Sequence, residues 1–240
     1  MTKGKKPKFS QEQYDLLIKS SKEGNGCKLW NDWIEENPHL KIELEGVNLT
    51  LANLSGANLS FANLEGAKLM AAHLENANLA GANLKSSLLL GTILEGAHLE
   101  KANLREAILE RARLEEVNLF KVHLEKANLR KANLFKVHLE GAYLEGASLK
   151  ETNLRRANLR DANLKGAHLE GADLREALFI DACLCNAKIT GVKLYGSNLS
   201  DWKIDGIECE FVYWNREGTK KQNMVEMNLK SDIHHTKHLM

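Results

Sequence analysis

The feature that most constrains this chain is an apolar residue at every fifth position from Leu44 to Ile204. These 33 positions, which we call the centres, hold Leu except at Phe179, Ile189 and Ile204. The residue two before the centre is Ala in 22 cases, the residue just before it is Asn in 14, and 13 of the 17 glycines lie two positions after it. A five-residue period fits neither an α-helix, with a period of about 3.6, nor a strand, with a period of about 2.

The remaining arrangement is a stacked coil whose short extended segments turn a corner every five residues. We expect the centre and the small residue to face inward and the other three positions to face outward. Asn and Gly suit the corners, because Asn bonds to nearby backbone and Gly tolerates a positive φ. The chain has no proline after Pro38, which fits stacked strands that need their N–H groups for hydrogen bonds.

Repeated Ala-Asn-Leu-x-x segments, such as residues 52–56 and 127–131, resemble the pentapeptide repeat proteins. The resemblance covers about two-thirds of the chain. It implies an all-β solenoid, namely a right-handed, four-sided β-helix with four pentapeptides per coil. The 33 repeats would then form about eight coils, and with about 4.8 Å between stacked strands the rod would be roughly 40 Å long.

An open end of such a rod would expose Leu side chains and unpaired strand edges, so we expect caps at both ends. We divide the chain into an N-terminal helical cap (1–40), the repeat β-helix (41–206), a C-terminal capping segment (207–216) and a polar, mobile tail (217–240). In the first cap, residues 10–23 and 26–36 are predicted to be helices; the first begins after Ser10 and the second ends before Pro38. Phe211, Tyr213 and Trp214 would either close the last coil or join two rods end to end in a homodimer.

Reactive motifs are sparse. The sequence contains no nucleophile elbow, phosphate-binding loop, dinucleotide fingerprint or zinc-protease helix, so we expect no enzyme activity and no catalytic, cofactor or metal site. Cys183 and Cys185 flank Leu184 without a second pair at zinc spacing. Two groups of histidines remain. The first group directly precedes a centre and is expected to face outward as polar residues: His73, His98, His123, His138 and His168. The second group lies in the tail, where the residues could share a helical face and capture a metal: His234, His235 and His238.

The four cysteines do not form a disulfide framework, and no run approaches the roughly 18 apolar residues of a membrane-spanning helix. The basic start is followed by polar residues rather than the apolar run of a secretory signal. We therefore expect a cytoplasmic protein with free thiols. The segment from Trp30 to Trp33, followed by Asn37 and Pro38, resembles the leader of many bacterial members of the family, which implies a bacterial source.

Charge limits the choice of partner. The chain has 33 Lys and Arg and 32 Asp and Glu, a net charge of +1, which argues against binding nucleic acid. Between residues 100 and 176 the outer positions alternate in sign, as expected for a solvated face whose ion pairs contribute about 0–1 kcal/mol each. Some family members resemble duplex DNA and bind type II topoisomerases, but a mimic needs roughly one negative charge per 1.7 Å of axis.

Apolar outer residues point instead to a protein partner. If the chain is folded at twenty residues per coil, Met70, Leu88, Leu90 and Ile108 lie on one side. Ile93 then lies around the corner, and Leu51 extends the row. Such a patch is typical of an interaction surface, although the N-terminal helices or the tail could also cover it. We therefore predict a noncatalytic, rod-shaped interaction scaffold for an unidentified protein partner, without a membrane. The alternative is a DNA-mimicking binder of a type II topoisomerase.

Overall fold

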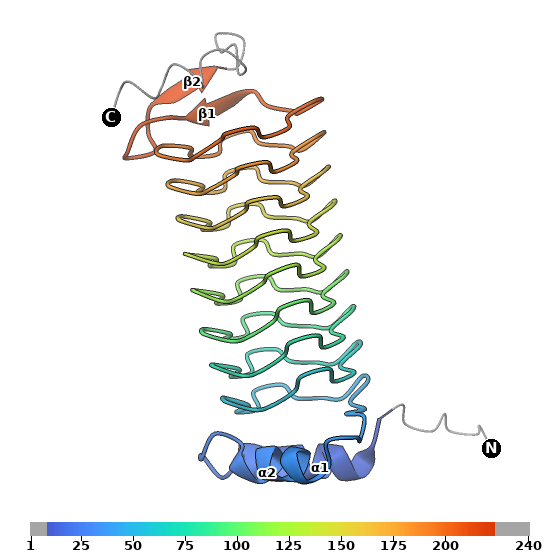
Figure 1. The fold of residues 1–240 in the computed structure, drawn as a ribbon. Helices are drawn as coiled ribbons and strands as arrows, with labels where there is room; N and C mark the ends of the chain where they lie inside the picture. The colour runs from blue at the N-terminus through green and yellow to red at the C-terminus, as the bar shows by residue number, and fades with distance from the viewer. Residues whose placement is uncertain (1–8, 224–240) are drawn as a thin grey trace, which may run out of the picture.

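The computed structural model describes residues 9–223. Figure 1 shows an elongated stack of coils with two helices across one end and a short hairpin at the other. The helices are α1 (Gln11–Ser21) and α2 (Lys28–Glu36), and the strands are β1 (Phe211–Tyr213) and β2 (Lys221–Asn223). Both helices lie inside the ranges expected from the sequence. Neither of them is long and apolar enough to cross a membrane, and no other helix occurs in this part of the chain.

Between α2 and β1 the chain winds in coils of twenty residues. Parallel bridges join each residue that precedes a centre to the residue twenty positions later, from Glu43–Asn63 to Lys193–Tyr213. Most pentapeptides also donate twice to the next coil; in the first, the N–H of Leu44 bonds to the Asn63 oxygen at 2.8 Å. This register places four pentapeptides in each coil, as the resemblance implies. We number the coils from the one that comprises residues 42–61.

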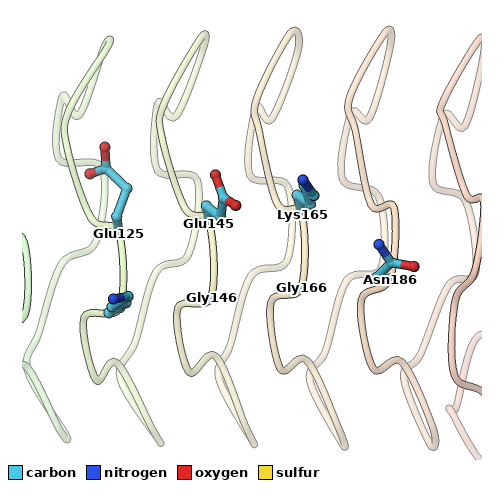
Figure 2. A pocket seen from close by; sticks show the side chains of 7 residues that line it. Glu125, Glu145, Gly146, Lys165, Gly166 and Asn186 are labelled. Atoms are coloured by element: carbon cyan, nitrogen blue, oxygen red, sulfur yellow. The ribbon is translucent and has the colours of Figure 1, made fainter.

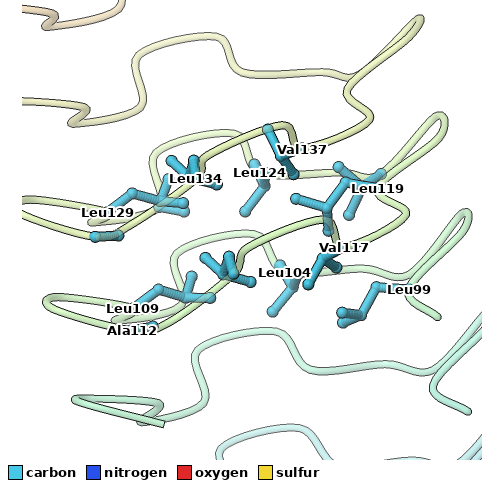
Figure 3. Close-up of a cluster of buried hydrophobic side chains, with 14 of the residues drawn as sticks. Leu99, Leu104, Leu109, Ala112, Val117, Leu119, Leu124, Leu129, Leu134 and Val137 are labelled. Carbon is cyan, nitrogen blue, oxygen red and sulfur yellow. The ribbon is translucent and has the colours of Figure 1, made fainter. Parts of the chain in front are cut away.

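The core is a set of apolar columns inside the coils. Every centre from Leu44 to Leu194 is at most 1% exposed, and nearly every residue two positions earlier is buried as well. Figure 3 shows this in two adjacent coils, where Leu104 and Leu124 point into the interior beside Val117 and Val137. The predicted inward orientation is therefore confirmed. Burial of each Leu contributes on the order of 1.5–3 kcal/mol.

All 33 corners share one backbone conformation. Each residue two positions after a centre has a positive φ, whether it is one of 13 glycines or one of 20 other residues such as Lys131 at 59°. A bond such as that from the Val47 N–H to the Leu44 oxygen closes the turn, which matches a type II turn with its positive φ at the third residue. The sequence indicated this conformation only where glycine is present. Elsewhere the ladders between coils impose it on residues that disfavour it.

The helices α1 and α2 supply the hydrogen-bond donors that a coil below the first one would have provided. In coil one, the carbonyl of each residue that precedes a centre accepts from the helical cap instead. The four pairs are Glu43 O with the Ser10 N–H (2.9 Å), Asn48 O with the Tyr14 hydroxyl (3.1 Å), Asn53 O with the Cys27 thiol (3.5 Å) and Asn58 O with Trp30 Nε1 (2.8 Å). The first edge of the solenoid is thereby closed at all four pentapeptides of coil one.

The other end of the solenoid is closed by the hairpin. Strand β1 forms the last rung, where the Tyr213 N–H donates to the Val192 oxygen at 2.8 Å, and β2 pairs with β1 in antiparallel fashion. The expectation of a mobile tail from residue 217 is wrong for residues 221–223, because β2 uses the otherwise unpaired edge of β1. Residues 224–240, including the three tail histidines, lie outside the described residues.

Candidate functional site

Four of the five residues of the predicted apolar wall lie on one side of the solenoid. Leu88 and Ile108 are bridge partners in coils three and four. Met70 and Leu90 directly follow the centres of the same side in coils two and three. The backbone oxygen of Leu90 accepts a hydrogen bond of 2.9 Å from the Ala71 N–H in coil two. Ile93 lies on the next side, around the corner as expected. We keep the name apolar wall for these five residues.

The wall is open to solvent. Leu90 is 43% exposed and Ile108 is 38% exposed, while Met70, Leu88 and Ile93 are half-buried. The row continues in coil one with Leu51, which is 72% exposed and whose N–H donates to the Met70 oxygen. Most other outward positions are polar, so this cluster is a feature of coils one to four rather than of the whole rod.

The backbone beneath the wall is already hydrogen-bonded on both edges. Leu88 donates to the Ala67 oxygen at 2.9 Å and accepts from the Leu69 N–H at 2.8 Å. No strand can therefore be added here, and a bound molecule would contact side chains only. The wall is consequently a rigid, preformed surface.

The helices α1 and α2 do not cover this surface. They lie across the end of the rod, where Tyr14 and Trp30 bond to coil one (Figure 1), and Leu90 and Ile108 stay exposed. The expectation that the N-terminal helices could cover the wall is therefore wrong. The second possible cover, the tail, lies outside the described residues from residue 224 onward.

The three C-terminal candidates, Phe211, Tyr213 and Trp214, pack on their own chain. The Phe211 ring lies against Gly191, and it meets the Tyr213 ring edge-on with 5.6 Å between the centroids. Lys221 Nζ lies 3.9 Å from the centroid of the Phe211 ring, which adds a cation–π contact from β2. Trp214 is half-buried against the core. These contacts give the three residues a capping position at the last coil.

Many charged residues on the outer positions form ion pairs with residues of the adjacent coil. Among the described residues, seven pairs join residues twenty apart: Lys85–Glu65 (3.9 Å), Arg105–Glu125 (3.0 Å), Lys131–Glu151 (3.5 Å), Lys136–Glu116 (2.9 Å), Lys150–Glu170 (2.9 Å), Arg156–Glu176 (2.7 Å) and Lys188–Glu208 (2.9 Å). The hydrogen bond from Lys136 holds the pKa of Glu116 below its usual range, and that from Arg156 does the same for the pKa of Glu176. The acidic residues therefore do not form an unbroken negative surface.

The five repeat histidines point outward and contact acidic neighbours. In each case His Nδ1 lies 3.0–3.6 Å from the carboxylate of the Glu two residues later, as in His123 with Glu125. The positions before and after a buried centre thus touch each other on the outer surface. Across residues 9–223, no three His, Cys, Asp or Glu residues are placed to hold a metal ion.

Two surface features were missed by the sequence reasoning. A shallow groove of about 420 Å³ follows one corner over successive coils, and its charged rim includes Glu145 and Lys165 (Figure 2). Gly146 and Gly166 leave it open, because neither adds a side chain to the corner. Phe61, which is 81% exposed, lies over Gly81 on another corner. Comparing corner residues that are twenty positions apart in the sequence would have revealed both the groove and the position of Phe61.

Comparison with known proteins identifies the repeat. A model of pentapeptide repeats matches the chain in 8 copies, over residues 43–69, 67–105, 97–134, 138–175 and 162–201. No curated protein sequence matches.

Similar solved structures belong to the same class. Rfr23, a pentapeptide repeat protein from the cyanobacterium Cyanothece 51142, is 44% identical over 36% of this chain and 59% of its own, with a TM-score of 0.36. HetL, involved in heterocyst differentiation regulation in Nostoc sp. strain PCC 7120, is 29% identical over 74% of this chain and 94% of its own, with a TM-score of 0.27. QnrB1, a plasmid-mediated fluoroquinolone resistance protein, is 17% identical over 69% of this chain and 88% of its own, with a TM-score of 0.36.

The family match spans nearly the whole solenoid, from residue 43 to residue 201. Within that span the buried centres recur every five residues and the coils repeat every twenty. This chain therefore belongs to the pentapeptide repeat family.

Proposed function

We propose that this protein is a noncatalytic, rod-shaped scaffold that binds another protein through the apolar wall. We infer that its solenoid is the right-handed, four-sided β-helix of the family. The observation that carries the proposal is the exposure of Leu90 and Ile108 beside Met70 and Leu88 on one rigid side. A patch of adjacent apolar side chains in an otherwise polar surface is typical of an interaction site.

The chemistry of the wall selects the kind of partner. Removing apolar surface from water contributes roughly 25 cal/mol per Å², and a preformed surface loses little conformational freedom on binding. The partner we propose is a protein that presents several apolar side chains over about 10 Å, which is the length of the two intervals between coils two and four. A charged ligand finds no counterpart at these positions.

The topoisomerase alternative receives less support from the charge distribution. A DNA mimic needs exposed acidic groups in a regular row, whereas Glu116 and Glu176 are paired with Lys136 and Arg156. Such pairs leave little net negative potential along the rod.

The proposal is tested with the double variant Leu88→Lys and Leu90→Lys. The matched control is Leu178→Lys, because Leu178 also precedes a centre and is also partly exposed, but on another side. Partners are captured with the wild type and both variants from a lysate of the source organism and identified by mass spectrometry. Circular dichroism verifies that each variant is folded, and light scattering measures self-association.

We expect one protein to be captured by the wild type and by the control variant, and to be lost with the double variant. Binding of that purified protein should then show a loss of at least tenfold in affinity for the double variant. Equal capture by folded double variant and wild type would contradict the wall as the site. Loss of capture with the control variant Leu178→Lys would also contradict the wall as the binding site.

A further inference from the structure

Two thiols lie side by side on the outer surface of coil eight. Cys183 and Cys185 flank the buried centre Leu184, and their Sγ atoms are 2.9 Å apart. Both cysteines are half-buried and free. The proposed scaffold function makes no use of this pair.

The coil geometry explains why these two thiols meet. They occupy the positions directly before and after a centre, and the same two positions bring His123 into contact with Glu125 at 3.0 Å and His73 into contact with Glu75 at 3.1 Å. The backbone is fixed as well, because the oxygens of Cys183 and Cys185 accept from coil seven at 2.7 and 2.9 Å. The approach of the two sulfurs is thus imposed by the solenoid.

The distance between the sulfurs decides between two uses of a dithiol. A disulfide has its sulfurs about 2.05 Å apart, so the two sulfurs, now 2.9 Å apart, would have to move closer to form one. Tetrahedral zinc, with Zn–S bonds of about 2.3 Å, would require the sulfurs to spread to about 3.8 Å and needs further ligands. Among the described residues no third His, Cys, Asp or Glu completes such a site.

We propose that Cys183 and Cys185 form a reactive dithiol that a low-molecular-weight disulfide, such as oxidised glutathione, converts into an intrachain disulfide. The thiolate of one cysteine attacks a sulfur of the small disulfide, which forms a mixed disulfide and expels one thiolate that takes up a proton. The second cysteine then attacks the first and expels the other small thiol. The protein loses two hydrogens, and one small disulfide becomes two thiols.

The surroundings of the pair assign the two roles. The pKa of the Cys185 thiol is raised, first by its hydrogen bond with Cys183 and also by burial and by the charge of Asp205. Because Cys185 holds its proton more firmly than an ordinary thiol does, we assign it as the resolving thiol and Cys183 as the attacking thiol.

The other two cysteines provide an internal contrast. Burial raises the pKa of Cys27 to about 11 and that of Cys209 to about 11. Few thiolates exist at these positions near neutral pH, so oxidation should be selective for the pair.

The test treats the full-length reduced protein with oxidised glutathione, blocks remaining thiols and digests the chain with trypsin. The peptide from Glu176 to Lys188 contains both cysteines of the pair and neither of the others. We expect this peptide to become two hydrogens lighter, with two thiols lost per chain and both restored by dithiothreitol. Cys183→Ser should instead accumulate a glutathione adduct on Cys185 when oxidation is prolonged, and Cys209→Ser should behave like the wild type.

Four results would overturn the proposal. The peptide could remain reduced, it could carry stable glutathione on both cysteines, or either cysteine could pair with Cys27, Cys209 or a second chain. In the fourth, equimolar zinc would protect both thiols from alkylation, which would make the pair a metal site. Circular dichroism of the folded variants separates each of these results from unfolding.

Discussion

The indole Nε1 of Trp30 donates a hydrogen bond of 2.8 Å to the backbone oxygen of Asn58. Trp30 is completely buried, and the centroid of its ring lies 5.5 Å from the centroid of the Trp33 ring. In later coils the equivalent oxygen accepts from a backbone N–H of the coil below, so the indole stands in for a missing coil.

Replacing Trp30 by Phe should destabilise the protein, because it leaves the Asn58 oxygen without this donor. We expect a loss of about 1–3 kcal/mol in the free energy of unfolding, measured by urea denaturation. Trp33→Phe is the matched control, since Trp33 is only partly buried. Equal losses in both variants would contradict a specific role for the indole bond.

Replacing Leu129 by Ala should remove part of the apolar column in coil five. Leu129 is fully buried, so we expect a loss of about 2–5 kcal/mol in the free energy of unfolding. Leu40→Ala should change it by less than about 0.5 kcal/mol, because Leu40 is 55% exposed. A comparable loss in the two variants would show that the column is not the main source of stability.

Replacing Gly166 by Ala should destabilise the protein through backbone strain alone, because the added side chain meets no steric clash at this corner. Gly166 has a φ of +64°, and a Cβ there would meet nothing within 4 Å. We expect a loss of about 1–2 kcal/mol. Gly81→Ala has a similar φ, but its Cβ would lie 2.7 Å from the Phe61 ring, so the thermal midpoint should fall further. The order of the two midpoints checks this prediction.

Acid should weaken the ion pairs between coils. Lys136 lowers the pKa of Glu116 in the folded state, so the pair stabilises the fold above the unfolded pKa of roughly 4.3 and loses its effect as pH falls through the lower, folded pKa. Lys136→Gln should therefore be less stable than wild type at neutral pH and approach it under acid conditions. Both residues are largely exposed, so the difference should be small and should shrink with added salt. Thermal midpoints between neutral pH and pH about 3 would measure it.

Most of the architecture is readable from the sequence because a fifth-residue Leu can be buried continuously only in a stacked coil. Leu129 and Ala127 are predicted to face inward, and both are at most 1% exposed. Grouping residues at an interval of twenty also places Leu88 beside Ile108, so the predicted wall residues follow from the register alone. The coil length that permits this grouping came from the family resemblance.

Other features depend on contacts that no local pattern contains. The bond from Trp30 to Asn58 joins residues 28 apart, and the pairing of Val212 with Gln222 extends the ordered structure into a segment predicted to be mobile. The positive φ of Lys131 is not a preference of lysine; it follows from the ladders above and below it.

The sequence by itself determined the five-residue register and which side chains enter the core, because burial of Leu and Ala depends only on their spacing along the chain. Only the tertiary structure decided how the ends are closed, whether helices cover Leu90, and how closely Cys183 approaches Cys185. These outcomes depend on hydrogen bonds and side-chain contacts between segments that meet only when the coils and their caps are assembled.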